Sequence, residues 1–232
     1  MQLTLTPETE FFAPLEDFGI RIESRFLYGA PAANLGAEGE IRVTRDPDPF
    51  PAYPGYRWGR DNETFEDILI PIGIPQTDDA GVTLATGNLG EVPETSQPLK
   101  GDATLSVLEP GGRLTSDQLT LPVHARTVWL GLRPDFEGES VAESTSAGFE
   151  AIAVDADGQR IALSDLQYEF VREETNYSWY QEYGEWRYTT QISTRIVAGG
   201  TFDLTSDAPA ALAQTLPWGR YRLTIVDPSS GA

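Results

Sequence analysis

Short runs of alternating apolar and polar residues, separated by Gly- and Pro-rich turns, occur twice along this chain in the same order. Alternation with a period of two is typical of a β-strand that buries one face. The run at Glu38–Arg45 is a clear example, because Ile41 and Val43 lie on one face of it. No segment has the pattern of a long amphipathic helix. The repeated order therefore predicts an all-β chain of two tandem domains.

The first half is organised around the stretch Arg25–Val43, which reads as the end of a strand, a Gly-Ala-Pro corner, a polar loop and a second strand. The strand before the corner is expected to run from about residue 20 through Phe26 and Tyr28 to Gly29. Phe65–Ile74 is apolar enough to predict a strand buried on both faces. Further strands are expected at 2–7, 38–45 and 81–86, and a hairpin at 99–123 with its turn at 109–112.

The second half repeats this layout. Strands are expected at 128–134, 148–154, 165–172, 192–198, 200–204 and 220–226, and the 208–214 stretch is expected to be a strand or a turn. The domain boundary is placed near Arg126, which gives domains at 1–126 and 127–232. The final strand of the first half, Leu114–Val123, has no counterpart in the second. The second domain is therefore expected to lack its last strand and to expose a strand edge.

The net charge of −20 argues against nucleic acid and anionic membrane as partners, because both need a basic surface. The chain contains no cysteine, which excludes disulfides, thiol catalysis and cysteine-ligated zinc. No apolar run is long enough to span a bilayer. Met1 leads directly into a predicted strand, so we expect no signal peptide within this sequence, and we expect both ends to be boundaries within a longer protein.

Each half carries an aromatic segment at the same place in the repeat. The first is Pro49–Gly59, which is rich in proline and therefore poor in strand donors. We expect an extended loop that covers a sheet edge or packs on the neighbouring domain. Its candidate contact residues are Tyr53, Tyr56 and Trp58.

The second aromatic segment is Tyr177–Tyr188, whose candidate binding or interdomain-contact residues are Tyr177, Trp179, Tyr180, Tyr183 and Trp186. One interpretation is a stacking platform for sugars or a contact surface for a protein. The favoured interpretation is a hairpin that turns between Glu182 and Glu185, with aromatic side chains paired across its strands.

No residue stands out as catalytic or as a metal ligand. His124, the only histidine, lies at the expected domain junction, where a linker or interdomain contact is a better explanation than a catalytic triad. Asp155–Gly158 resembles the start of a calcium loop but lacks the further ligands, which favours a hairpin turn with Gly158 at positive φ. Acidic pairs such as Glu173 and Glu174 are common in so acidic a chain. We therefore expect no cofactor, no metal and no enzymatic activity.

Phe26–Leu35, Pro49–Gly59 with the acidic 63–67 after it, Leu166–Tyr180 and Trp218–Leu223 together resemble the macroglobulin domains of bacterial alpha-2-macroglobulins. The resemblance covers nearly the whole chain and is weakest at Glu8–Ile20. It implies seven-stranded antiparallel β-sandwiches of the fibronectin III or immunoglobulin-like kind, strung in tandem. The family's reactive cysteine-containing thioester motif lies in another domain, so that chemistry cannot be assigned to any residue here.

The resemblance further implies that the full-length protein traps proteases after they cleave a bait segment, and that it resides in the periplasm or cell envelope. The expected partners are neighbouring macroglobulin domains and, through the full-length protein, target proteases. The resulting hypothesis is a non-catalytic scaffold fragment. The alternative is a carbohydrate-binding or adhesin-like module that uses the Tyr177–Tyr188 aromatics, and it requires those rings to be coplanar and exposed.

Overall fold

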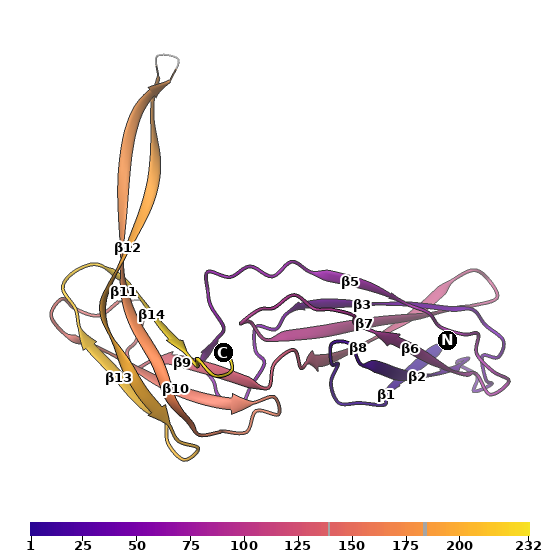
Figure 1. Cartoon of the computed structure of the whole chain (residues 1–232). Helices are drawn as coiled ribbons and strands as arrows, with labels where there is room; N and C mark the ends of the chain where they lie inside the picture. The colour runs from indigo at the N-terminus through magenta and orange to yellow at the C-terminus, as the bar shows by residue number, and fades with distance from the viewer. Residues whose placement is uncertain (139, 183–184) are drawn as a thin grey trace. The chain divides into compact units, whose positions relative to one another are not determined.

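The structure is a computed structural model that describes residues 1–138, 140–182 and 185–232. Every helix or strand assigned in these residues is a β-strand (Figure 1). The all-β, antiparallel fold class expected from the sequence is confirmed. The chain divides into two compact units, the first formed by residues 1–51 and 61–127 and the second by 52–60 and 128–232. The described residues contain no helix long and apolar enough to cross a membrane.

Unit 1 contains two antiparallel sheets. The three-stranded sheet has the order β1 (Gln2–Pro7), β2 (Asp17–Arg25), β6 (Val82–Asn88). The four-stranded sheet has the order β5 (Ile68–Ile72), β3 (Ala37–Arg45), β7 (Leu99–Leu108), β8 (Leu114–Val123). The predicted hairpin at 99–123 is confirmed, with Leu108 opposite Leu114 at its turn.

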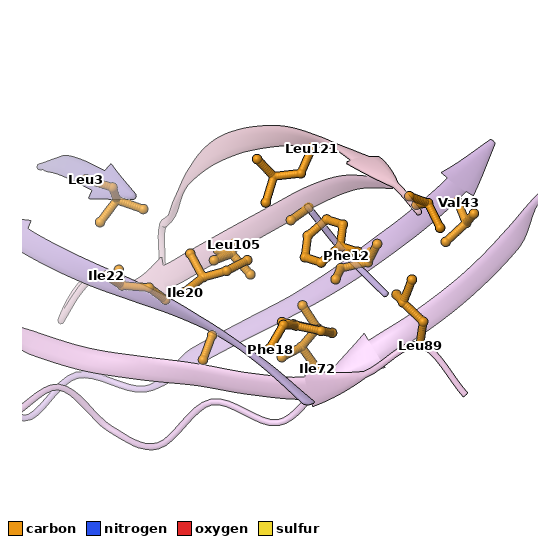
Figure 2. Packing of buried hydrophobic residues seen from close by; sticks show 14 of the residues in the cluster. Leu3, Phe12, Phe18, Ile20, Ile22, Val43, Ile72, Leu89, Leu105 and Leu121 are labelled. Carbon is orange, nitrogen blue, oxygen red and sulfur yellow. The ribbon is translucent and has the colours of Figure 1, made fainter. Parts of the chain in front are cut away.

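The core of unit 1 is built from the inward faces of both sheets. Ile20 and Ile22 of β2 are fully buried, as is Leu105 of β7, while Arg21 between the two isoleucines is exposed. Figure 2 shows Phe12 among these side chains. Its ring meets that of Phe18 edge-on at 5.0 Å. The apolar residues that alternate with polar ones in the sequence thus point inward and form the core between the two sheets.

The Gly-Ala-Pro corner follows β2 directly. The strand ends at Arg25, so the expectation that it continues to Gly29 is wrong: residues 26–29 form a turn, and Gly29 adopts a φ of 95°. The corner is held by buried polar groups. The hydroxyl of Ser24 donates to the carbonyl of Gly81 at 2.9 Å, and that of Thr77 donates to the carbonyl of Ala32 at 2.8 Å. These bonds tie the corner to the chain segments around residues 77 and 81 and give buried backbone carbonyls a hydrogen-bond partner.

Unit 2 also contains two antiparallel sheets. One has the order β13 (Ala210–Thr215), β10 (Ser146–Asp155), β9 (Val128–Pro134), β4 (Arg57–Trp58). The other has the order β12 (Glu185–Leu204), β11 (Leu163–Glu182), β14 (Arg220–Val226). The core between them includes Ala151, Ala153, Leu166, Leu204 and Leu212.

The strand orders of the two units correspond. The arrangement β9-β10-β13 repeats β1-β2-β6, and β12-β11-β14 repeats β5-β3-β7. Two differences remain. β4 is added beside β9, and β14 pairs only with β11 among the described residues, whereas its counterpart β7 pairs with both β3 and β8.

Two further expectations from the sequence need correction. The strand expected at Phe65–Ile74 is the shorter β5, which is not buried on both faces, since Leu69 and Pro71 are exposed. The two strands expected at 192–198 and 200–204 are one strand, β12, because Gly199 and Gly200 continue the pairing with β11. The counterpart of β6 is therefore β13, which lies in the stretch expected to be a strand or turn.

Candidate interaction surfaces

Residues 52–60, which include most of the first aromatic segment, belong to unit 2, whereas the sequence predicted the whole segment within a continuous domain at 1–126. Its strand β4 pairs with the edge of β9, with Arg57 opposite Leu132 and Trp58 opposite Gly131. Trp58 is only 6% exposed. A Cβ atom at Gly131 would lie 2.8 Å from its ring, so the close approach of the indole requires a glycine at that position of β9.

Tyr56 anchors the same segment through polar contacts. Its hydroxyl donates a hydrogen bond to Oε2 of Glu150 on β10 at 3.0 Å. Arg133 of β9 forms an ion pair with the same carboxylate, and its guanidinium carbon lies 4.7 Å from the centroid of the Tyr56 ring. The neighbouring Tyr53 donates to the carbonyl of Gly158 at 3.1 Å. The segment is therefore fixed to β9, β10 and the turn that follows β10.

These contacts change the protonation equilibria of the cluster. Burial, together with the hydrogen bond to Glu150, raises the pKa of Tyr56 to about 12. The hydrogen bond from Arg133, followed by that from Tyr56, lowers the pKa of the Glu150 carboxyl. The cluster is thus held as a neutral phenol beside a charged carboxylate–guanidinium pair.

The second aromatic segment forms the far end of the β11–β12 hairpin. β14 pairs with β11 only as far as Glu173, and beyond that point β11 and β12 continue as a two-stranded ribbon (Figure 1). The register brings Trp179 opposite Tyr188, and Glu182 opposite Glu185. A hairpin with aromatic side chains paired across its strands is what the structure contains. Tyr183 lies outside the described residues.

The ribbon has two chemically different faces, because successive cross-strand pairs point to opposite sides. One face carries aromatic and aliphatic side chains together with threonines and a glutamine. We call it the aromatic face, and its residues are Thr175, Tyr177, Trp179, Gln181, Trp186, Tyr188, Thr190 and Ile192. The other face is more polar and includes Glu174, Asn176, Ser178 and the pair of Tyr180 with Arg187. The candidate residue Tyr180 therefore lies on the opposite face from Tyr177 and Trp179.

The aromatic face is exposed. Trp179 is 63% exposed and Trp186 is 68% exposed. The rings are inclined to one another, by 63° for Tyr177 with Tyr188 and by 52° for Trp179 with Tyr188. The rings are thus exposed, as the carbohydrate-binding alternative requires, but they are not coplanar.

The two remaining candidates from the sequence, His124 and the Asp155–Gly158 segment, make contacts that account for them structurally. The ring of His124 stacks on that of Phe11 at 4.1 Å, and its backbone N–H donates to the carbonyl of Phe12. The segment after Asp155 is a turn in which Gly158 adopts a φ of 77° and Oδ1 of Asp155 accepts from the backbone of Gln159. Among the described residues, no group of three or more His, Cys, Asp or Glu side chains could hold a metal ion.

Sequence reasoning did not find Arg133, Glu150 or Gly131, which receive the first aromatic segment. They are separated from it by more than 70 positions, and none belongs to a recognisable motif. The signal that was available is the placement of Tyr53, Tyr56 and Trp58 in a proline-rich stretch that cannot form a regular central strand.

Two antiparallel sandwiches with corresponding strand orders define a pair of immunoglobulin or fibronectin III-like domains. Residues 1–124 match the family model described as the bacterial alpha-2-macroglobulin MG5 domain, and residues 131–232 match that of bacterial macroglobulin domain 6. The chain belongs to the bacterial alpha-2-macroglobulin family, which confirms the resemblance drawn from the sequence.

Curated relatives support this membership. The chain is 29% identical over 239 residues to the alpha-2-macroglobulin of Xylella fastidiosa (strain 9a5c), a match that covers 100% of this chain and 14% of that protein. It is 27% identical over 250 residues to the alpha-2-macroglobulin of Escherichia coli K12, covering 99% of this chain and 15% of that one. The chain thus spans about one-seventh of the length of these relatives.

Among solved structures, the chain is similar to Escherichia coli alpha-2-macroglobulin activated by porcine elastase. The TM-score is 0.73 at 27% identity, and the match covers 100% of this chain and 21% of that one.

Proposed function

We propose that this chain is a non-catalytic scaffold portion of a bacterial alpha-2-macroglobulin that inhibits endopeptidases by trapping them. The proposal is carried by one observation, the match of two consecutive macroglobulin family models to residues 1–124 and 131–232. The E. coli relative described as activated by porcine elastase links the family to proteases.

In this proposal the chain acts mechanically. Each unit is a sandwich of antiparallel sheets around its own buried core, a construction that resists deformation because close-packed interiors have low compressibility. Such units can hold other parts of a longer protein at fixed positions while a protease cleaves elsewhere. The sequence contains no cysteine, so a thioester would have to be supplied by another part of the protein.

The proposal extends to location and partners. We place the parent protein in the periplasm or cell envelope, with neighbouring macroglobulin domains as direct partners of this chain and proteases as targets of the whole protein. The carbohydrate-binding alternative is less favoured, because the exposed rings of the hairpin are inclined by 52° and 63° rather than aligned in one plane.

A protease assay with two substrates tests the proposal. Trypsin or elastase is mixed with the 232-residue chain or with a parent polypeptide of the length of the relatives, and cleavage is followed on a small chromogenic peptide and on a large protein. We expect the parent to block cleavage of the large substrate while sparing the small one, and the 232-residue chain to affect neither. Inhibition by the 232-residue chain at low stoichiometry would refute the scaffold role, and a parent without effect on the large substrate would refute trapping.

A further inference from the structure

We propose that the aromatic face of the β11–β12 ribbon is a docking surface for another β-sandwich domain of the longer polypeptide, engaged much as residues 52–60 engage β9. The inference rests on the proposed function, in which this chain is one part of a multidomain scaffold. It names a specific surface and the chemistry of its partner.

The first support is the equivalent position of the two aromatic segments. Residues 46–67 connect β3 to β5, which are neighbours in one sheet of unit 1. The ribbon is formed by the far ends of β11 and β12, which are the corresponding neighbours in unit 2. The same connection of the fold therefore carries an aromatic segment in both units.

The second support is what the first of these segments does. It leaves the strands of unit 1 and adds β4 to the edge of β9, the first strand of the domain that follows in the chain. There Trp58 is buried against Gly131. The hydroxyl of Tyr53 donates to the carbonyl of Gly158, and that of Tyr56 donates to the carboxylate of Glu150. Residues 52–60 therefore show how a β-sandwich domain can bind an aromatic segment through one buried indole and two tyrosine hydroxyls.

The third support is the composition of the ribbon. All residues of the aromatic face are uncharged, in a chain whose net charge is −20. Trp179, Trp186, Tyr188 and Ile192 are each more than half exposed on it. Adjacent exposed apolar side chains of this size mark an interaction surface, since each would be more stable when removed from water.

These features specify the partner. An uncharged face with tyrosine hydroxyls fits an apolar strand or sheet surface that also offers a carbonyl or carboxylate acceptor, as β9 and β10 offer to Tyr53 and Tyr56. Because the chain spans only 14–15% of its relatives' length, most of the parent polypeptide is available to supply that surface.

Hydroxyl-radical footprinting with residue-level mass spectrometry tests the proposal. Oxidation rates of Trp179 and Trp186 are compared between the 232-residue chain and the full-length parent. Tyr28, which is 80% exposed in unit 1, is the exposed reference, and the buried Trp58 is the protected reference. We expect Trp179 and Trp186 to be oxidised at least several-fold more slowly in the parent, with both references little changed. Equal rates in the two polypeptides would overturn the proposal.

Two neighbouring substitutions on one strand give a matched control. Trp179→Lys places a charge on the aromatic face, and Ser178→Lys places the same charge on the opposite face. In the parent, W179K should restore rapid oxidation of Trp186, whereas S178K should not. Equal effects of the two variants would show that the aromatic face is not the contact. Far-UV circular dichroism of both variants checks that the fold is retained.

Other occupants give different results. Protection of Trp186 in the 232-residue chain that increases with its concentration would identify a second copy as the occupant and overturn the proposal. Protection by glycans added to the 232-residue chain would do the same in favour of a sugar. The footprint does not depend on protease inhibition, so a parent that fails to trap proteases but still protects Trp186 would refute the proposed function without refuting the docking surface.

Discussion

The hydroxyl of Tyr56 lies 3.0 Å from Oε2 of Glu150, although the two residues are 94 positions apart in the chain. Tyr56 comes from the connection between β3 and β5 of unit 1, and Glu150 belongs to β10 of unit 2. Arg133 binds the same carboxylate and lies over the Tyr56 ring. This hydrogen bond is therefore a sensitive reporter of whether residues 52–60 are attached to unit 2.

Replacing Tyr56 with Phe removes this hydrogen bond and keeps the ring. We expect the free energy of unfolding of unit 2 to fall by about 1.5–3 kcal/mol, the usual net contribution of a hydrogen bond to a charged group. Urea denaturation followed by circular dichroism measures it. Tyr28→Phe, at an exposed tyrosine, is the control and should leave the midpoint unchanged. A Y56F variant as stable as the wild type would show that the bond contributes nothing.

The raised pKa of Tyr56 predicts a late ionisation at alkaline pH. Because its pKa in the folded chain is about 12, above the ordinary value of 10.0, the folded state favours the neutral phenol. The associated stability is fully present below pH 10 and is lost as the pH rises through about 12. Absorbance at 295 nm should show a tyrosinate component with this midpoint that Y56F lacks. A difference titration centred near the ordinary value would contradict the prediction.

Replacing Gly131 with Ala should dislodge Trp58. The new Cβ would lie 2.8 Å from the indole ring, so β4 must shift away from β9. We expect a loss of about 1–3 kcal/mol, as for an overpacked core, and red-shifted tryptophan emission. Gly148→Ala on β10 is the control, because its new Cβ would meet Asp135 at an ordinary 3.4 Å. Equal emission spectra for the two variants would refute the role of the close approach.

Phe12 and Phe11 give a neighbouring pair for the core of unit 1. Phe12 is 1% exposed, and its ring packs against Gly101 and Phe18 (Figure 2). Phe12→Ala should lower the free energy of unfolding of unit 1 by about 3–5 kcal/mol. Phe11→Ala removes only a partly exposed ring stacked on His124 and should cost clearly less. Thermal and urea unfolding of both variants measures the two losses, and a Phe11→Ala loss as large as that of Phe12→Ala would contradict the prediction.

The edge of β14 predicts a difference in amide exchange. Among the described residues β14 pairs only with β11, so its N–H groups on the other side have no strand partner, whereas those of β7 face β3 and β8. In the 232-residue chain, we expect exchange to be faster over Arg220–Val226 than over Leu99–Leu108. In a longer parent the β14 amides should slow if another strand completes the sheet. Exchange equally slow in both strands of the 232-residue chain would contradict the open edge.

Local patterns predicted the elements whose pairing is short-range. The hairpin of β7 and β8 was predictable because a Pro-Gly-Gly turn separates two strongly patterned runs, and the pairing of β11 with β12 because aromatic residues occur symmetrically in both. β4 was not predictable as a strand, since two residues carry no periodicity and their partner β9 lies over 70 positions away. The prediction for Phe65–Ile74 was wrong because its apolar content suggested burial on both faces. The strand β5 instead lies at the edge of its sheet and exposes Leu69 and Pro71.

The same non-local pairing explains why the partner residues of the candidate surface were missed. Glu150 and Arg133 lie in β10 and β9, largely apolar strands in which a single charged residue gives no sequence signal of a distant partner. Only the tertiary structure brings them to the Tyr56 hydroxyl. In the ribbon, the alternation of side chains along a strand predicts that Tyr180 and Trp179 lie on opposite faces. The sequence does not predict how many residues of β11 and β12 are paired.

The insertion of residues 52–60 into unit 2 makes the backbone pass between the two units three times, near residues 51, 60 and 127. One peptide-bond cleavage near Arg126 would therefore leave the halves joined by two further stretches of chain. Gene rearrangements that exchange domains at that boundary would carry β4 away from the β9 edge that receives it. An exchange of one domain would therefore have to keep Gly131, Arg133 and Glu150 together with residues 52–60, the segment that they hold.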